Sequence, residues 1–231
     1  MSNQKAIKTM QIIGGISLIL FPLILMVAFA MHFQSISEFF IFKLKYMQGP
    51  VESTVNMLMG SDAASSYINP HLIAYFSVPF MIFASLALGY VLFKKKPWFA
   101  LIGTLTTLMG SVFISGVFAA WLSFAAIGNM PVNQFDGAVS AFRELTTMQG
   151  PLAMTTYLSV LSLLGFLVLA VGLFQSRIVP KWSASLIFIG NLMIIVFMDL
   201  DNWMLIGALL MLIGIMPVSK SLFRESLQNN V

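Results

Sequence analysis

The sequence predicts an all-α membrane protein, a polytopic bundle of six transmembrane helices. Three observations predict this fold class. Hydrophobic residues make up 59% of the chain and charged residues only 9%, whereas a soluble domain carries about 25% charged residues. Several apolar runs are near the ~20 residues that span a bilayer. The charges between the runs also alternate in sign from one connection to the next.

The apolar runs define the expected spans. They occupy residues 10–31, 71–93, 98–127, 151–174, 182–198 and 203–218. The last two are short, and we interpret them as a tight helical hairpin; one re-entrant or interfacial segment is the alternative. With 231 residues, the chain forms a single membrane domain, residues 1–231, with little room for a soluble one.

The first run imitates a secretory signal peptide, because Lys5 and Lys8 precede it and Ala28-Phe29-Ala30 resembles a cleavage site. The apolar region of a signal peptide is usually ~7–15 residues long, and this run is longer. We therefore expect a retained first span.

The charges predict the orientation. The N-terminus, the connections at 94–97 and 175–181 and the C-terminus together hold nine Lys and Arg residues and one Glu. The alternate connections hold three basic and seven acidic residues. Because Lys and Arg favour the cytoplasmic side, both termini are expected in the cytoplasm, and six spans satisfy every connection.

The two long outer connections contain predicted amphipathic helices at 35–47 and 132–147. In the second, Phe135, Val139, Phe142 and Leu145 recur at steps of three and four residues, which is one helix face. We expect both helices to lie flat in the interface with the apolar face toward lipid.

Each outer helix runs into the same four residues, Met-Gln-Gly-Pro, at 47–50 and 148–151. Proline is favoured in the first turn of a helix, so the motif predicts the start of a new helix. Gln48 and Gln149 are then candidate ligand-binding residues, because helix N-termini present free N–H groups. A turn with a capping Gln is the alternative interpretation.

The chain also contains an internal repeat. Ile13-Gly14, Ile102-Gly103 and Ile189-Gly190 each stand early in an outward-going span. This predicts parallel helix-pair pseudo-repeats made of spans 1–2, 3–4 and 5–6. Glycines recur seven residues apart in three spans, which indicates close helix contact. They are Gly103 and Gly110, Gly165 and Gly172, and Gly207 and Gly214.

Candidate polar sites are few. No Lys, Arg, Asp or Glu falls in the middle of a run, which argues against a proton-coupled transporter. Asn191 is the clearest amide within a span; it is a candidate ligand-binding residue, although a bond to a neighbouring helix is the favoured interpretation. His32, His71, Asp199 and Asp201 are expected at the outer face, and imidazole with carboxylate is a candidate metal site. Ordinary polar residues at a water boundary are the alternative.

Other chemistries have no support. The chain has no cysteine, which excludes disulfides, thiolate metal sites and Cys nucleophiles. The P-loop, the Rossmann fingerprint, the G-x-S-x-G elbow and nucleic-acid motifs are missing. No cofactor and no nucleic-acid partner are therefore expected; the expected partner is the lipid bilayer.

One stretch carries a resemblance. Residues 172–182 (GLFQSRIVPKW) precede a span containing Ile187 to Gly190, and the N-terminal lysines lead into Ile12-Ile13-Gly14-Gly15. This pattern resembles an uncharacterised family of bacterial multi-pass integral membrane proteins, over about a quarter of the chain. The resemblance implies a bacterial inner-membrane location, and it brings no catalytic residue, cofactor or substrate.

Three functions remain open. The favoured one is the binding or movement of a lipophilic small molecule or lipid, which a co-purifying ligand would support. A regulatory or scaffolding protein acting through a partner is the second. An enzyme with an outer-face His/Asp site is the third; unchanged metal content and unchanged cellular phenotype in His71→Ala and Asp199→Ala variants would count against it.

Overall fold

Every element in the described part of the chain is a helix. The computed structural model describes residues 3–33, 35–40, 51–60, 67–146, 150–198 and 200–228. The elements are α1 (Asn3–Ala30), α2 (Ile36–Phe39), α3 (Val51–Leu58), α4 (Asn69–Phe93), α5 (Pro97–Leu122), α6 (Phe124–Gly128), the 3-10 turn η2 (Val132–Gln134), α7 (Phe135–Thr146), α8 (Gly150–Ser176), α9 (Lys181–Val196) and α10 (Asp201–Gln228). The predicted all-α class is confirmed.

Five stretches of helix are long and apolar enough to cross a membrane. They are Gln4–Ala30, Asn69–Phe93, Pro97–Gly128, Ala153–Ser176 and Asp201–Gln228. The shorter α9 has 16 residues. The first and last helices extend beyond the predicted runs, because backbone hydrogen bonds continue a helix into polar surroundings where no apolar side chain is required.

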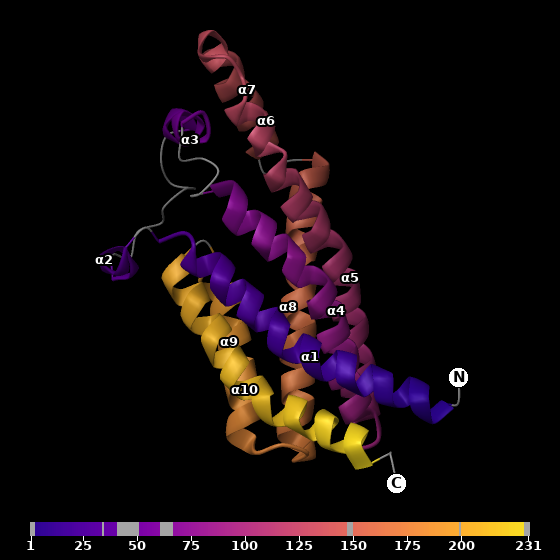
Figure 1. Cartoon of the computed structure of the whole chain (residues 1–231). Coiled ribbons are helices and arrows are strands. Elements are labelled where there is room, and N and C mark those ends of the chain that lie inside the picture. Colours follow the sequence, from indigo (N-terminus) through magenta and orange to yellow (C-terminus); the bar gives the residue numbers. More distant parts are fainter. Residues whose placement is uncertain are drawn as a thin grey trace.

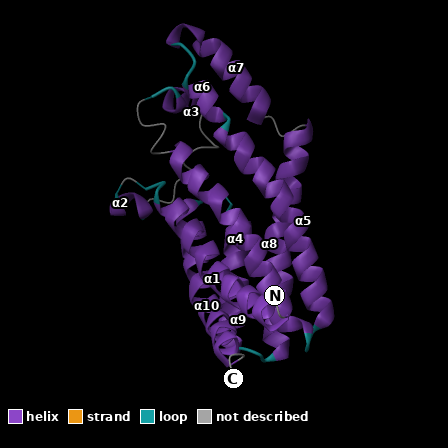
Figure 2. Cartoon of the chain, turned by 45° about the vertical axis from the view of Figure 1, so that its right-hand side comes forward, coloured by secondary structure: helices purple, strands orange, loops and turns teal. Residues whose placement is uncertain are grey.

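The long helices lie side by side in one bundle (Figures 1 and 2), and their contacts form a ring in chain order. Each of α1, α4, α5, α8 and α9 packs on the next, and α10 closes the ring against α1. Gln11, in the first half of α1, donates a hydrogen bond to Glu225, near the end of α10 (Nε2 to Oε2, 3.1 Å). The beginning of α1 and the end of α10 therefore lie at the same end of the bundle.

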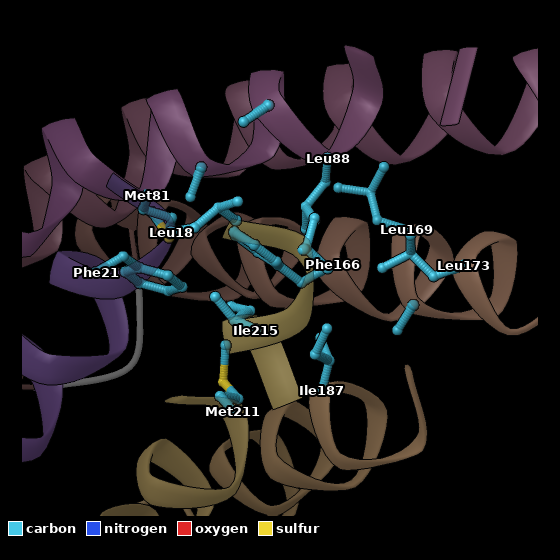
Figure 3. Packing of buried hydrophobic residues seen from close by; sticks show 14 of the residues in the cluster. Leu18, Phe21, Met81, Leu88, Phe166, Leu169, Leu173, Ile187, Met211 and Ile215 are labelled. Carbon is cyan, nitrogen blue, oxygen red and sulfur yellow. The ribbon is translucent and has the colours of Figure 1, made fainter. Parts of the chain in front are cut away.

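The centre of the ring is filled by side chains. Phe21 of α1 and Phe166 of α8 stack with ring centroids 5.1 Å apart, and both are almost completely buried (Figure 3). Leu88 of α4 and Met211 and Ile215 of α10 lie around them with no exposed surface. An apolar core of this kind packs the helices against one another.

Glycines let the helices approach closely. A Cβ on Gly103 of α5 would lie 3.0 Å from the carbonyl oxygen of Gly165 on α8, and one on Gly214 of α10 would lie 2.7 Å from that of Ser183 on α9. Ser183 Oγ donates to the Gly214 carbonyl oxygen at 2.6 Å. The predicted role of these glycines in helix contact agrees with these distances.

The outer surface of the bundle is apolar at mid-helix. Ile16, Phe83, Leu105, Met109 and Val112 are each more than two-fifths exposed. A water-facing surface with so many large apolar side chains would aggregate. The surface fits contact with lipid tails, as expected of a membrane protein.

The predicted interfacial helix at 132–147 forms as α7, but its surroundings differ from the prediction. Val139 and Phe142, expected to face lipid, are buried against α3 and α6. The prediction was wrong on this point, because an apolar helix face is equally well covered by protein. We name this group the outer cluster; it consists of Val55, Leu58, Tyr67, Phe124, Ile127, Ala138, Val139 and Phe142.

The other outer helices follow the prediction in part. Of the helix expected at 35–47, only α2 lies within the described residues. The helix α3 was not predicted, although Val51, Val55 and Leu58 have helical spacing. It begins directly after the first Met-Gln-Gly-Pro segment, and α8 begins at Gly150 within the second. Both new helix starts agree with the predicted role of the motif.

Candidate functional site

Three helix ends meet at one end of the bundle. His32 follows the last turn of α1, His71 stands in the first turn of α4, and Asp201 begins α10. The start of α4 is favoured by Pro70, whose missing N–H costs nothing in a first turn. Because α4 and α10 both pack on α1, the three side chains come together.

The central contact joins the imidazole of His32 to the carboxylate of Asp201. Nδ1 of His32 lies 3.1 Å from Oδ1 of Asp201. The side chains are only 9% and 15% exposed, so water screens the pair weakly. Asp201 also stands in the first turn of α10, where the helix dipole stabilises a carboxylate. The pair fixes the end of α1 against the start of α10.

His71 is held by its own turn and by aromatic rings. Its Nδ1 lies 2.6 Å from the carbonyl oxygen of Tyr67. Since a carbonyl only accepts, Nδ1 carries the hydrogen, and in the neutral ring Nε2 is the acceptor. The ring centroid lies 4.4 Å from that of Tyr67, 4.6 Å from that of Trp121 and 5.3 Å from that of His32.

The structure thus brings together three of the four residues predicted as metal ligands. The fourth, Asp199, lies outside the described residues. In the described ranges, no group of three or more His, Asp and Glu side chains is arranged to hold a metal ion.

The predicted ligand-binding residues do not join this cluster. Gln48 and Gln149 lie outside the described residues. Asn191 is fully buried in α9, and its Nδ2 donates to the Leu163 carbonyl oxygen of α8 at 2.6 Å. This is a bond to a neighbouring helix, the interpretation of Asn191 that its sequence context favours.

An apolar depression beside the cluster was not predicted. It has a volume of about 410 Å³ and is lined by Ala30, Phe33, Ser35, Ile36, Phe39 and Leu205. Two of these flank His32 in the chain, and Leu205 stands one turn after Asp201 on α10. The depression therefore has apolar walls from α1, α2 and α10, close in the chain to His32 and Asp201, which are not among its lining residues.

Asn202 of α10 holds the end of α2 beside the depression. It is 1% exposed, and its Nδ2 donates to the carbonyl oxygen of Phe39. The sequence gives only weak signals for this part of the site. One is the polar Asn202 early in α10. The other is the aromatic residues after the end of α1, which also fit an aromatic belt at the membrane interface. The depression can receive an apolar chain against these walls, and Ser35 is the polar residue of its lining.

Comparisons of the chain with protein-family models, with curated proteins and with solved structures found no match.

Proposed function

We propose that this chain is a six-span protein of the bacterial cell membrane that binds or moves a lipophilic small molecule or lipid at its outer end. The observation that carries the proposal is the apolar depression beside the buried His32 and Asp201 pair. A molecule with an apolar body and one polar group fits the apolar walls and Ser35, the polar residue that lines the depression. A water-soluble polar molecule would leave the apolar walls uncovered.

The six-span topology is supported by the path of α9. Lys181, at its start, lies near Phe174 at the end of α8, with Nζ 5.1 Å from the ring centroid. The α9 helix then leads to Asp201, which contacts His32 at the other end of the bundle. A 16-residue helix rises about 24 Å, which is near the ~30 Å of the hydrocarbon core, and the turn before Asp201 adds length.

The three helix-pair repeats are supported by equivalent contacts. A Cβ on Gly14 of α1 would lie 2.7 Å from Cβ of Ala87 on α4. Gly103 meets Leu169 on α8, and Gly190 meets Met211 on α10. In each pair, the glycine of the first helix faces the returning helix, as a repeated unit requires.

The topology is tested with single cysteines, since the natural chain has none. We expect a membrane-impermeant maleimide added to intact cells to label Asp136→Cys and to spare Lys95→Cys and Arg224→Cys until the cells are opened. If α9 did not cross, the end of α10 would lie outside, and Arg224→Cys would be labelled in intact cells.

The binding proposal is tested by native mass spectrometry of the protein released from lipid nanodiscs, with elemental metal analysis of the same sample. We expect a retained lipid or other lipophilic molecule. A stoichiometric metal would instead favour an enzyme at the His and Asp residues. A protein with nothing bound would favour a function through a partner.

Two matched variants locate the bound molecule. Ala30→Trp places a large ring in the depression, whereas Val27→Trp adds the same ring one turn earlier on α1, at a residue that is 42% exposed and does not line the depression. We expect Ala30→Trp to lose the bound molecule and Val27→Trp to retain it, with similar thermal stability. Equal retention in both variants would exclude the depression as the site.

A further inference from the structure

At the opposite end of the bundle, two basic connections lie side by side. Lys96, between α4 and α5, donates from Nζ to Oε1 of Gln175 at 3.3 Å, and Gln175 belongs to the last turn of α8. This bond links the α4–α5 connection to the α8–α9 connection. We name this region the two-loop surface; its cations are Lys94, Lys95, Lys96, Arg177 and Lys181.

The two-loop surface contains no compensating acid. Residues 94–97 and 175–181 include no Asp or Glu. Lys94, Lys95, Arg177 and Lys181 are exposed. Positive charge of this density attracts an anion at the membrane surface.

Aromatic side chains accompany these cations. Trp98 is 72% exposed and Trp182 is 52% exposed, each within two residues of a lysine of the two-loop surface. Exposed Trp side chains are typical of the depth at which lipid headgroups lie. Cations and Trp side chains together fit a phospholipid better than a soluble polyanion. A soluble polyanion has no apolar part that could cover the Trp rings.

Arg177 provides a separate observation. Its φ is 53°, a left-handed conformation that costs any residue with a Cβ free energy and that glycine adopts without this cost. The backbone N–H of Arg177 donates to the carbonyl oxygen of Leu173 and ends α8. Glycine would end the helix equally well, so the arginine is explained by its side chain and not by its backbone.

From these observations we propose that the two-loop surface binds the headgroup of an anionic phospholipid, with the Arg177 guanidinium and the exposed lysines around the phosphate and the two Trp rings beside the acyl chains. This site is independent of the apolar depression at the other end of the bundle. Arginine suits the role because its planar guanidinium donates two parallel hydrogen bonds to a phosphate.

The proposal is tested by adding phosphatidylglycerol or phosphatidylcholine to the purified full chain in an uncharged detergent and measuring bound lipid by native mass spectrometry. We expect the wild type to prefer phosphatidylglycerol. Each removed cation is expected to weaken binding about fivefold, so Lys95→Gln with Arg177→Gly weakens it about 25-fold. The control, Lys220→Gln with Arg224→Gln, removes two exposed charges from the same end of the bundle outside the two-loop surface and is expected to change it less than about threefold.

Single variants at Arg177 separate binding from folding. Arg177→Gly is expected to raise or preserve the melting temperature without lipid while weakening phosphatidylglycerol binding, and Arg177→Lys is expected to restore most of the binding. Equal binding of the two lipids by the wild type would overturn the proposal. So would equal weakening by the two double variants, or unchanged binding in Arg177→Gly.

Discussion

Nδ1 of His32, at the end of the first helix, lies 3.1 Å from Oδ1 of Asp201, at the start of the last helix. The contact joins the first and the last helix of the bundle, α1 and α10. Both side chains are largely buried, so the contact places an imidazole nitrogen and a carboxylate oxygen together with little access to water. The pair therefore has a structural role whether or not a ligand is bound.

We expect Asp201→Ala to lower the free energy of unfolding by about 1–3 kcal/mol, since it removes a partner from a buried polar side chain. Asp201→Asn is expected to cost less, because the amide has the same shape and leaves a polar group beside Nδ1 of His32. Chemical unfolding of the protein in detergent measures both values.

The control for this prediction is Asp136→Asn, at an exposed residue in the first turn of α7, which is expected to change stability by less than about 0.5 kcal/mol. A double-mutant cycle with His32→Phe and Asp201→Ala should give a coupling of about 0.5–3 kcal/mol. Strict additivity of the two substitutions would show that the contact contributes nothing.

A second prediction concerns the packing of α5 on α8. A Cβ added at Gly110 would overlap the backbone nitrogen of Ser162, whereas one added at Gly116, on the same helix, would meet no atom within 4 Å in the described part of the chain. Gly110→Ala is expected to destabilise by about 1–3 kcal/mol through overpacking. Gly116→Ala is expected to be neutral or to stabilise by up to about 1 kcal/mol. Thermal unfolding of the two variants measures this difference, and equal melting temperatures would contradict the close contact.

The helices could be predicted from sequence because lipid imposes long apolar runs, but their packing could not. Leu18 is fully buried and Ile16 is 43% exposed, yet the two side chains are almost equally apolar. In a soluble protein the exposed face of each helix would be polar, and the alternation of polar and apolar residues would show which residues are buried. In lipid that contrast is lost, so neither the closure of α10 on α1 nor the stacking of Phe21 on Phe166 was predictable.

The candidate site was predictable to the extent that topology determines it. His32, His71 and Asp201 were expected at the same face because each follows or precedes a predicted span. The contact of Asn202 with Phe39 and the rings around His71 depend on where short outer helices fold back, which a local pattern does not specify. Similarly, Val139 and Phe142 of the face predicted for α7 are buried, whereas Leu145 is 42% exposed. The partner of this face was not predicted.

A third prediction concerns Asn191. Its Nδ2 donates to α8, but its buried Oδ1 has no hydrogen-bond partner among the described residues. Asn191→Leu removes the donor and the unsatisfied oxygen together, so we expect a change in stability of less than about 1 kcal/mol. Asn191→Asp places a charge within the bundle and is expected to cost at least about 2.5 kcal/mol. Unfolding in detergent compares the two; loss of a bound ligand in a stable Asn191→Leu protein would instead indicate a binding role.

A fourth prediction separates the forces that hold the outer cluster. Phe142 is 8% exposed, with its ring centroid 4.9 Å from that of Phe124, so Phe142→Ala is expected to cost about 3–5 kcal/mol in this region. The neighbouring Arg143 pairs with Glu52 at 3.1 Å, but the two side chains are 61% and 50% exposed, and such a pair contributes about 0–1 kcal/mol. Hydrogen exchange of the α3 amides should therefore accelerate strongly in Phe142→Ala and little in Arg143→Ala. Equal acceleration in both variants would mean that the ion pair, and not apolar packing, fixes α3 to α7.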